Sequence, residues 1–290
     1  MPNLKDIRRR IRSVKKTQQI TRAMRMVAGA KLRRAQNAVL QARPYAARMR
    51  ATLAEVARVP QDVVHPLLEP RAQTRRVEIV VITSNRGLCG AFNANVLRFA
   101  DRLVAARERE GQQVTITCIG RKTVEYFARR RPRQLEGKHV YDGWASYASA
   151  AELAGSFSER FGSGTTDEVV LVFSEFVSAL SQTPRAARLL PATPEPTGAS
   201  DAPLPVEIEP SADELIAVLV PKAIEVEVFR ALLENQAGEH AARMASMEAA
   251  TRNTEDLISR LTLQFNRARQ AAITKELVEI VSGAEALKSS

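Results

Sequence analysis

Residues 28–56 read AGAKLRRAQNAVLQARPYAARMRATLAEV. Apolar residues recur here at alternating steps of three and four, at Ala28, Leu32, Ala35, Val39, Ala42, Ala46, Met49, Leu53 and Val56. The same steps occur upstream, at Leu4, Ile7, Ile11 and Val14. This spacing is typical of the apolar seam of a coiled coil, so we predict one long helix over residues 3–57, about 80 Å long at 1.5 Å per residue.

The seam is interrupted between residues 18 and 27. Polar residues occupy the seam positions, while apolar residues stand in the neighbouring rows: Gln18, Thr21 and Arg25 against Ile20, Met24 and Val27. We predict that the apolar stripe shifts phase here and that this part of the helix changes its contact partner. Met24 and Met26 suit an adaptable contact with another protein, and a device that fixes the register is the alternative.

The C-terminal region repeats the pattern. Ser211 and Glu214 have the S-x-x-E spacing of a capping box, which predicts that a helix begins there. Its seam residues are Val226, Arg230, Leu233, Ala237, His240, Met244, Met247, Thr251, Thr254, Ile258, Leu261, Phe265, Ala268 and Ala272. Two long terminal helices of matching period predict an antiparallel coiled coil, provided that the middle of the chain is an inserted domain.

The middle of the chain has a different sequence pattern, in which short β-rich runs alternate with helical stretches. Strands are predicted over residues 77–84, 114–119 and 168–176, and helices over 93–110, 121–130 and 147–161. This alternation favours a parallel or mostly parallel sheet with right-handed crossovers. The fold class is therefore α+β overall, a long antiparallel coiled coil with an inserted central α/β (Rossmann-like) domain. We predict four parts: helix 1–60, α/β domain 75–192, Pro-rich linker 193–210 and helix 211–286.

Composition and charge narrow the classes of function. The 290 residues carry a net charge of +11, and residues 1–60 hold 16 Lys and Arg against 2 Asp and Glu. The longest apolar runs are far shorter than the ~20 residues that span a bilayer, so no membrane insertion is expected. The cysteines and histidines have no metal-ligand or disulfide spacing, which predicts no metal and fits a reducing compartment.

The basic N-terminal region has two interpretations. A charged, solvated helix face is the usual meaning of such a run, and nucleic-acid binding is the sharper alternative. Residues 1–44 contain no aromatic side chain that stacks on bases, and the seam already commits one face of the helix to a partner helix. We therefore expect no nucleic-acid partner.

The turn Thr83–Gly90, with the sequence TSNRGLCG, is the best candidate for a site of chemistry. It follows a predicted strand and precedes a predicted helix, where phosphate-binding loops occur. It matches neither the G-x-G-x-x-G nor the P-loop pattern, so a structural turn is favoured over nucleotide binding. No catalytic triad, carboxylate pair or general base is recognisable, and we expect no catalysis and no cofactor.

Four segments resemble the gamma subunit of F-type ATP synthases. They are residues 7–36, which include TQQITRAMRMVA at 17–28, then ITSNRGLCGAFN at 82–93, AARMASM at 241–247 and NRARQAAITKELVEIVSG at 266–283. The four motifs occur in order on a coiled-coil, α/β, coiled-coil frame. The resemblance covers essentially the whole chain and is weakest over residues 120–210.

The resemblance implies a non-catalytic central-stalk rotor that couples rotation of a membrane ring to ATP synthesis or hydrolysis in the beta subunits. The implied partners are the alpha and beta subunits, the epsilon subunit and the ring of c subunits. The coiled coil would lie inside the alpha–beta hexamer, with the α/β domain near the ring. The implied location is peripheral, on the cytoplasmic face of the bacterial inner membrane.

The resemblance also implies contact residues. The family's contacts with beta fall on Met24 and Arg25 near the N-terminus and on Arg269, Gln270, Thr274 and Glu276 near the C-terminus. Arg25 departs from the acidic residue expected at that position in many relatives. The cysteine-bearing regulatory insert of the chloroplast form has no counterpart, so thiol control is not expected.

Two other functions remain open from the residues alone. One is a basic coiled-coil protein that binds nucleic acid, and the other is a small α/β nucleotide-binding enzyme with helical arms. Salt-dependent DNA binding would favour the first, and nucleotide turnover by the isolated chain would favour the second.

Overall fold

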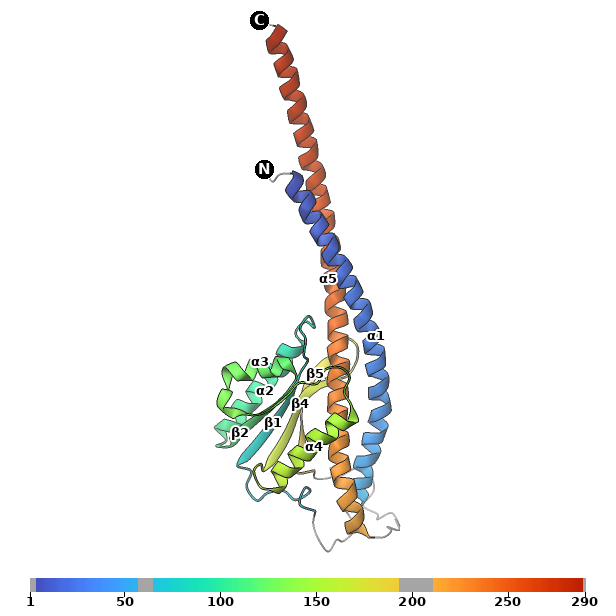
Figure 1. The fold of residues 1–290 in the computed structure, drawn as a ribbon, viewed down its shortest axis with the longest axis vertical. Coiled ribbons are helices and arrows are strands. Elements are labelled where there is room, and N and C mark those ends of the chain that lie inside the picture. The colour runs from blue at the N-terminus through green and yellow to red at the C-terminus, as the bar shows by residue number, and fades with distance from the viewer. Residues whose placement is uncertain (1–3, 57–64, 193–210, 289–290) are drawn as a thin grey trace. The chain divides into compact units, whose positions relative to one another are not determined.

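A computed structural model describes residues 4–56, 65–192 and 211–288 (Figure 1). The chain forms two compact units, one of residues 1–27 and 244–290 and the other of residues 28–243, and each is described by itself. Helices α1 (Leu4–Val56) and α5 (Ala212–Lys288) contribute to both units. The predicted linker 193–210 lies outside the described residues, and the proposed division into four parts stays a prediction.

The first unit is an antiparallel pair of helix segments from α1 and α5. The Gln18 side chain donates to Glu255 over 3.2 Å, the Thr21 hydroxyl lies 2.9 Å from that of Thr251, and the Arg8 guanidinium stacks on Phe265. As the residue number increases along α1, the number of its partner on α5 thus decreases. The predicted antiparallel coiled coil is confirmed within this unit.

The seam keeps its register through residues 18–25, and the predicted phase shift is wrong. Thr21 is buried, Gln18 and Arg25 are half-buried, and Ile20 and Val27 are exposed. Polar side chains therefore continue the seam, because Thr21 finds a hydroxyl partner across it and Gln18 finds a carboxylate. Of the apolar residues in the neighbouring rows, Ile20 and Val27 are exposed and Met24 is half-buried.

The second unit contains a five-stranded sheet in the order β3-β2-β1-β4-β5. The strands are β1 (Arg76–Ile82), β2 (Gln113–Ile119), β3 (Leu135–His139), β4 (Glu168–Phe176) and β5 (Gln182–Leu190). All neighbouring pairs are parallel except β4 and β5, which form an antiparallel hairpin. The predicted mostly parallel sheet is confirmed.

Helices cover both faces of this sheet (Figure 1). On one face, α2 (Phe92–Arg109) and α3 (Arg121–Arg130) pack on Ile79, Val81 and Ile116. On the other face, α4 (Tyr147–Gly162) and the first turns of α5 pack on Val80, Leu171 and other residues of β1 and β4. Alternate residues of each strand thus supply two separate cores, as expected for a three-layer α/β unit.

The predicted elements match the observed ones to within two residues at each end. Three elements were not predicted: β3, β5 and a short 3-10 helix, η1 (Pro132–Gln134). The start of α5 is as predicted, because the Ser211 hydroxyl accepts the backbone N–H of Glu214 over 3.2 Å. None of the described helices is both long enough and apolar enough to cross a bilayer.

Candidate functional site

Met24 and Arg25, the predicted contacts on α1, are both half-buried in the first unit. Ile20, Met26 and Val27 surround them and are exposed, Met26 to 61%. These apolar side chains lie outside the seam with α5. Ile20 and Val27, seven residues apart, share one face of the helix, and Met26 is exposed beside Val27, which suits contact with another protein.

Arg269, Gln270, Thr274 and Glu276, the predicted contacts on α5, are all exposed. The described side chains after Ala272 are exposed without exception, including Ile273, Leu277, Val278, Ile280 and Val281. Five large exposed apolar residues in one short segment are more than a helix that faces only solvent normally carries. This part of α5 therefore has the properties of a surface that another protein covers.

The two groups of predicted contacts do not come together. Thr21 lies opposite Thr251, so Met24 lies about one turn away, near residue 248. Gln270 is 22 residues further along α5, which is about 33 Å at 1.5 Å per residue. Two separate contacts, rather than one joint site, are available to a partner.

The turn Thr83–Gly90 makes structural contacts. The Ser84 hydroxyl and the Asn93 side chain bond to each other, and the Asn85 side chain accepts the backbone N–H of Arg121 and donates to the carbonyl of Tyr141. Arg243 of α5 donates to the carbonyls of Arg86 and Gly87 at 3.4 and 3.2 Å. The turn thus joins the carboxyl end of the central strand β1 to α5, as its interpretation as a structural turn requires.

A cavity of about 80 Å³ lies beside this turn, at the carboxyl ends of β1 and β2. Its lining includes Tyr141, Trp144, Asn235 and Glu239. Pockets that hold cofactors and other small ligands usually measure about 300 to 1,000 Å³. The position typical of ligands in such sheets therefore does not suit a nucleotide here.

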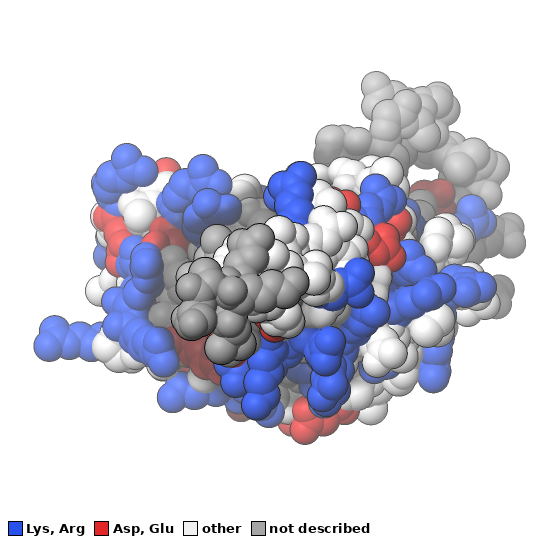
Figure 2. Space-filling view, turned by 90° about the horizontal axis from the view of Figure 1, so that it is seen from above, with Lys and Arg blue, Asp and Glu red and all other residues white. Residues whose placement is uncertain are grey.

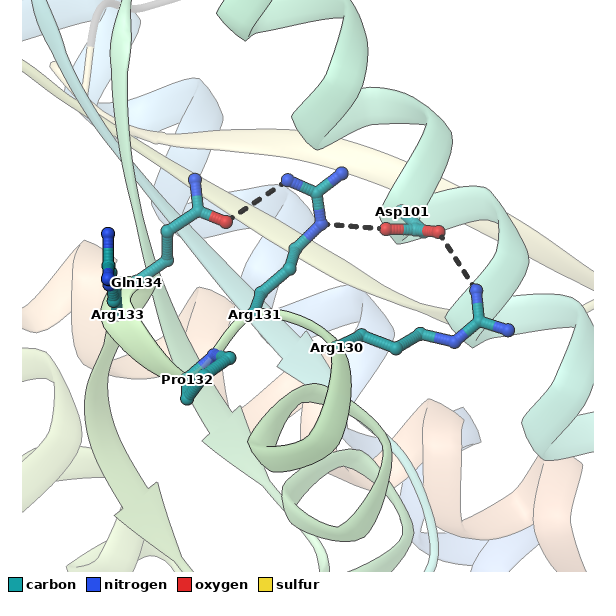
Figure 3. Close-up of a pocket in the computed structure, with 6 residues that line it drawn as sticks. All are labelled: Asp101, Arg130, Arg131, Pro132, Arg133 and Gln134. Carbon is teal, nitrogen blue, oxygen red and sulfur yellow. Dashed lines mark hydrogen bonds and ion pairs between the residues drawn. The ribbon is translucent and has the colours of Figure 1, made fainter.

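An open hollow of about 640 Å³ lies at the end of α3, lined by Asp101, Arg130, Arg131, Pro132, Arg133 and Gln134 (Figure 3). Arg131 Nε donates to Asp101 over 2.8 Å, and Arg131 also pairs with Glu108 at 2.9 Å. Burial opposes its charge, but hydrogen bonds to Asp101 and Glu108 outweigh burial and raise the pKa of Arg131. The carboxylates thus hold the central guanidinium in a structural role.

Basic side chains are also widespread elsewhere. On the face that Figure 2 shows, Lys and Arg side chains cover more area than Asp and Glu side chains. Arg9 pairs with Asp6 and Arg252 pairs with Glu248, both at exposed positions. Such pairs are ordinary features of solvated helix faces.

The described residues contain no group of three or more His, Cys, Asp and Glu side chains placed to hold a metal ion. Cys89 and Cys118 are buried and unpaired. Burial raises the pKa of Cys89, and it raises that of Cys118 to about 12. Neither thiol has the lowered pKa of a reactive cysteine.

Comparison with known proteins extends these observations to the whole chain. The model of the family described as ATP synthase matches residues 3–287. The ATP synthase gamma chain of Anaeromyxobacter sp. (strain Fw109-5) is 50% identical, over 99% of this chain and all of that protein. The chain belongs to the ATP synthase gamma-chain family. The gamma chain of Chlorobaculum tepidum is 48% identical over the same shares.

Solved structures support the fold of this family member. A chain of the Euglena gracilis mitochondrial ATP synthase superposes with a TM-score of 0.69 at 21% identity, covering 98% of this chain and 94% of that one. A central-stalk chain of the Tetrahymena thermophila enzyme gives 0.60 at 24% identity, covering 80% and 99%. The resemblance stated from the sequence is confirmed. The comparisons do not support a nucleic-acid-binding protein or a small nucleotide-binding enzyme.

Sequence reasoning missed one group of residues, the polar network in which Arg43, Arg230 and Glu234 meet the end of β4. Arg230 was predicted only as a seam residue. The one sequence signal is a pair of opposite charges, Arg230 and Glu234, four positions apart with only Ala and Leu between them.

Proposed function

We propose that this chain is the central-stalk rotor of an ion-translocating ATP synthase and carries no catalytic site of its own. It couples rotation of a membrane ring to ATP synthesis or hydrolysis in the beta subunits. The main support is full-length identity of about half to gamma chains of bacterial ATP synthases. The exposed apolar end of α5 adds physical support, because a helix that is surrounded by other subunits needs an apolar surface for them to contact.

The contact residues belong to the same proposal. Met24 and Arg25 form one contact with beta, and Arg269, Gln270, Thr274 and Glu276 form the other. Because an asymmetric helix pair presents different side chains in different directions, each beta subunit meets a different surface at a given angle. Rotation then favours each nucleotide-binding state of beta in turn through differential contact.

The proposed partners are the alpha, beta and epsilon subunits and the c subunits of the membrane ring. The coiled coil formed by 1–60 and 211–286 occupies the hexamer, and the α/β domain 75–192 lies near the ring. The location is peripheral, on the cytoplasmic face of the inner membrane. The translocated ion in this proposal is a proton or sodium.

Copurification tests the assignment. The tagged chain is expressed with the alpha and beta subunits of the same source, and the mass of the purified complex is measured. We expect a complex with three copies each of alpha and beta and one copy of this chain, and ATP hydrolysis that the isolated chain lacks. Turnover by the isolated chain, or failure to join the hexamer, would contradict the proposal.

Substitutions test the contacts. Alanine at Arg269, Gln270, Thr274 and Glu276 is expected to leave the thermal midpoint of the free chain unchanged, since all four are exposed, and to slow ATP-driven rotation. A control replaces Lys122 and Glu125, a surface ion pair on α3 that lies outside both proposed contacts, with alanine. Met24→Lys is expected to preserve hydrolysis and to lower the number of ions pumped per ATP, because the added charge binds one rotary position too tightly.

A further inference from the structure

Glu234 of α5 is a buried carboxylate that joins three elements of the second unit. Its side chain is 2% exposed. Oε1 accepts from Arg230 over 2.9 Å on the same helix and from Arg43 of α1 over 3.4 Å. Oε2 accepts the backbone N–H of Phe176, the last residue of β4, over 3.3 Å. A single carboxylate thus bonds to both long helices and to the sheet.

Arg43 completes the connection from α1. Its Nη2 donates to the carbonyl of Phe176 over 2.6 Å. The N–H and the C=O of one residue at the end of β4 are therefore both held by side chains of the helix pair. Burial opposes the charge of the neighbouring Arg230, but the Glu227 and Glu234 carboxylates outweigh it and raise the pKa of Arg230. Both oxygens of Glu234 accept hydrogen bonds and two guanidinium groups lie beside it, as a buried carboxylate requires.

This network differs in kind from the rest of the contact between α5 and the sheet. Most of that contact is apolar, through residues such as Val220, Ile224 and Val228. Apolar contact is non-directional, so a helix that shifts sideways over it loses little free energy at first. Charge-assisted hydrogen bonds are directional and weaken steeply when their geometry changes.

In a rotor, torque produces a lateral force between the sheet and the helix pair. We propose that Arg43 and Glu234 form a clamp on Phe176 that transmits torque between the α/β domain and the coiled coil. This inference rests on the proposed rotor function. Arg43 and Glu234 act as positioning residues: they fix the angle of the domain about the helices and touch no substrate.

Arg50 provides a matched control for Arg43. It lies two turns further along α1 and pairs with Glu227 of α5 over 2.8 Å. The two arginine side chains are comparably exposed, 39% for Arg43 and 55% for Arg50. Arg50 has no hydrogen bond to the sheet among the described residues. Arg43→Met and Arg50→Met therefore each remove one helix-to-helix ion pair, but only the first releases the sheet.

The first measurement tests the clamp in the free chain and does not depend on function. Amide exchange at Phe176 is followed by NMR or by mass spectrometry of peptides. The Phe176 N–H donates to Glu234, and Arg43 holds Glu234 and the Phe176 carbonyl in place. We expect exchange about tenfold faster in Arg43→Met, because the end of β4 then opens more often, and unchanged exchange in Arg50→Met. Equal exchange in both variants would overturn the clamp. Glu234→Gln keeps an acceptor for the Phe176 N–H. Its exchange rate at Phe176 is therefore expected to lie between that of Arg43→Met and that of the parent.

The second measurement tests torque. In the assembled, surface-attached complex, a bead is bound to a single reactive cysteine made by Arg133→Cys, since both natural cysteines are buried. The spread of bead angles during pauses reports the stiffness between the helix pair and the α/β domain. We expect a wider spread of bead angles and fewer ions pumped per ATP for Arg43→Met than for Arg50→Met, measured at a temperature where both variants are fully folded.

The outcomes separate the two proposals. Faster exchange at Phe176 with an unchanged angular spread would refute torque transmission by the clamp and leave the rotor function intact. A parent chain that joins no hexamer would refute the rotor function itself. Restoration of the parent spread by Arg43→Lys, which keeps a charged donor, would support the clamp.

Discussion

The hydroxyl of Thr251 lies 2.9 Å from the hydroxyl of Thr21, where apolar residues normally meet in a coiled coil. Thr251 also bonds to the carbonyl of Met247, and Thr21 bonds to that of Gln18. Both side chains are buried. A polar pair that fits only one alignment of two helices fixes their register, at some cost in stability.

Substitution of this pair should separate the roles of its methyl and hydroxyl groups. The double variant Thr21→Val/Thr251→Val keeps the shape and leaves no polar group unpaired, so its unfolding free energy should equal or exceed that of the parent. Thr21→Ala/Thr251→Ala also removes methyl packing and should cost about 1 to 2 kcal/mol. Denaturant unfolding of the free chain measures both. Equal losses would show that the hydroxyl contact, and not the methyl packing, stabilises the pair.

Leu261 and Leu263 test the register of the first unit. Leu261 is half-buried on the seam, and Leu263 is exposed. Leu261→Asp places an unpaired charge against α1 and should lower the unfolding free energy by about 2 kcal/mol or more. Leu263→Asp should change it by less than about 0.5 kcal/mol. A similar loss in both variants would place the seam on another face of α5.

Glu78 is a charged residue in the centre of the sheet. It is fully buried on β1 and accepts from Thr117 over 2.6 Å and from Arg160 Nε over 2.9 Å. Glu78→Ala leaves Arg160 without this partner and should cost about 3 to 5 kcal/mol. Glu175→Ala removes a more exposed pair with Arg185 and should cost less than about 1 kcal/mol. Thermal unfolding of the two variants should therefore differ clearly in midpoint.

His240 should make the second unit sensitive to acid. Burial, with the charges of Arg243 and Lys31, lowers the pKa of His240 to about 4. The folded state keeps the ring neutral while the unfolded state takes up a proton below about pH 6.5. Stability is therefore complete above that pH and falls as the pH decreases towards 4, by on the order of 1 to 2 kcal/mol at pH 5.

A variant isolates this effect from the other histidines, because burial also lowers the pKa of His65 and His139. His240→Phe keeps an aromatic contact with Trp144, whose ring centroid is 5.8 Å away. The loss of unfolding free energy between pH 7 and pH 5 should be smaller in His240→Phe than in the parent. An identical loss would assign the acid sensitivity to other groups.

The long helices could be predicted from sequence because their burial follows a simple period. Every seam residue named for the C-terminal helix, from Val226 to Ala272, is buried or half-buried in the structure. Strands β1 and β4 could be predicted because both of their faces are covered, which makes them continuous apolar runs.

The edge strands could not be predicted in the same way. Strand β5 reads QTPRAARLL, with a proline and two arginines, because it lies at the edge of the sheet and is largely accessible to water. Strand β3 is five residues long and contains a glycine, since a Cβ at Gly137 would come within 3.1 Å of Thr117. Half-buried and exposed residues do alternate along β3, but its half-buried positions hold Leu, Gly and His, so the apolar signal is weak.

The candidate contacts came from family resemblance, and their burial could be predicted only in part. The period placed Arg25 on the seam, where it is half-buried. The clamp was beyond reach, because Arg43 and Glu234 are 191 residues apart in the chain. Their proximity depends on how α1 is aligned with α5. The apolar period alone does not determine this alignment, because pairings shifted by a whole heptad satisfy it equally well.

The exposed end of α5 bears on the fate of copies that never join a complex. After Ala272 the described side chains are all exposed, with an ion pair between Lys275 and Glu279 to support the last turns. A single helix of this length is only marginally stable in water. In a free chain we expect this end to fray and to be cut first by proteases. We therefore expect that the segment proposed to contact beta is also the place where degradation of surplus copies begins.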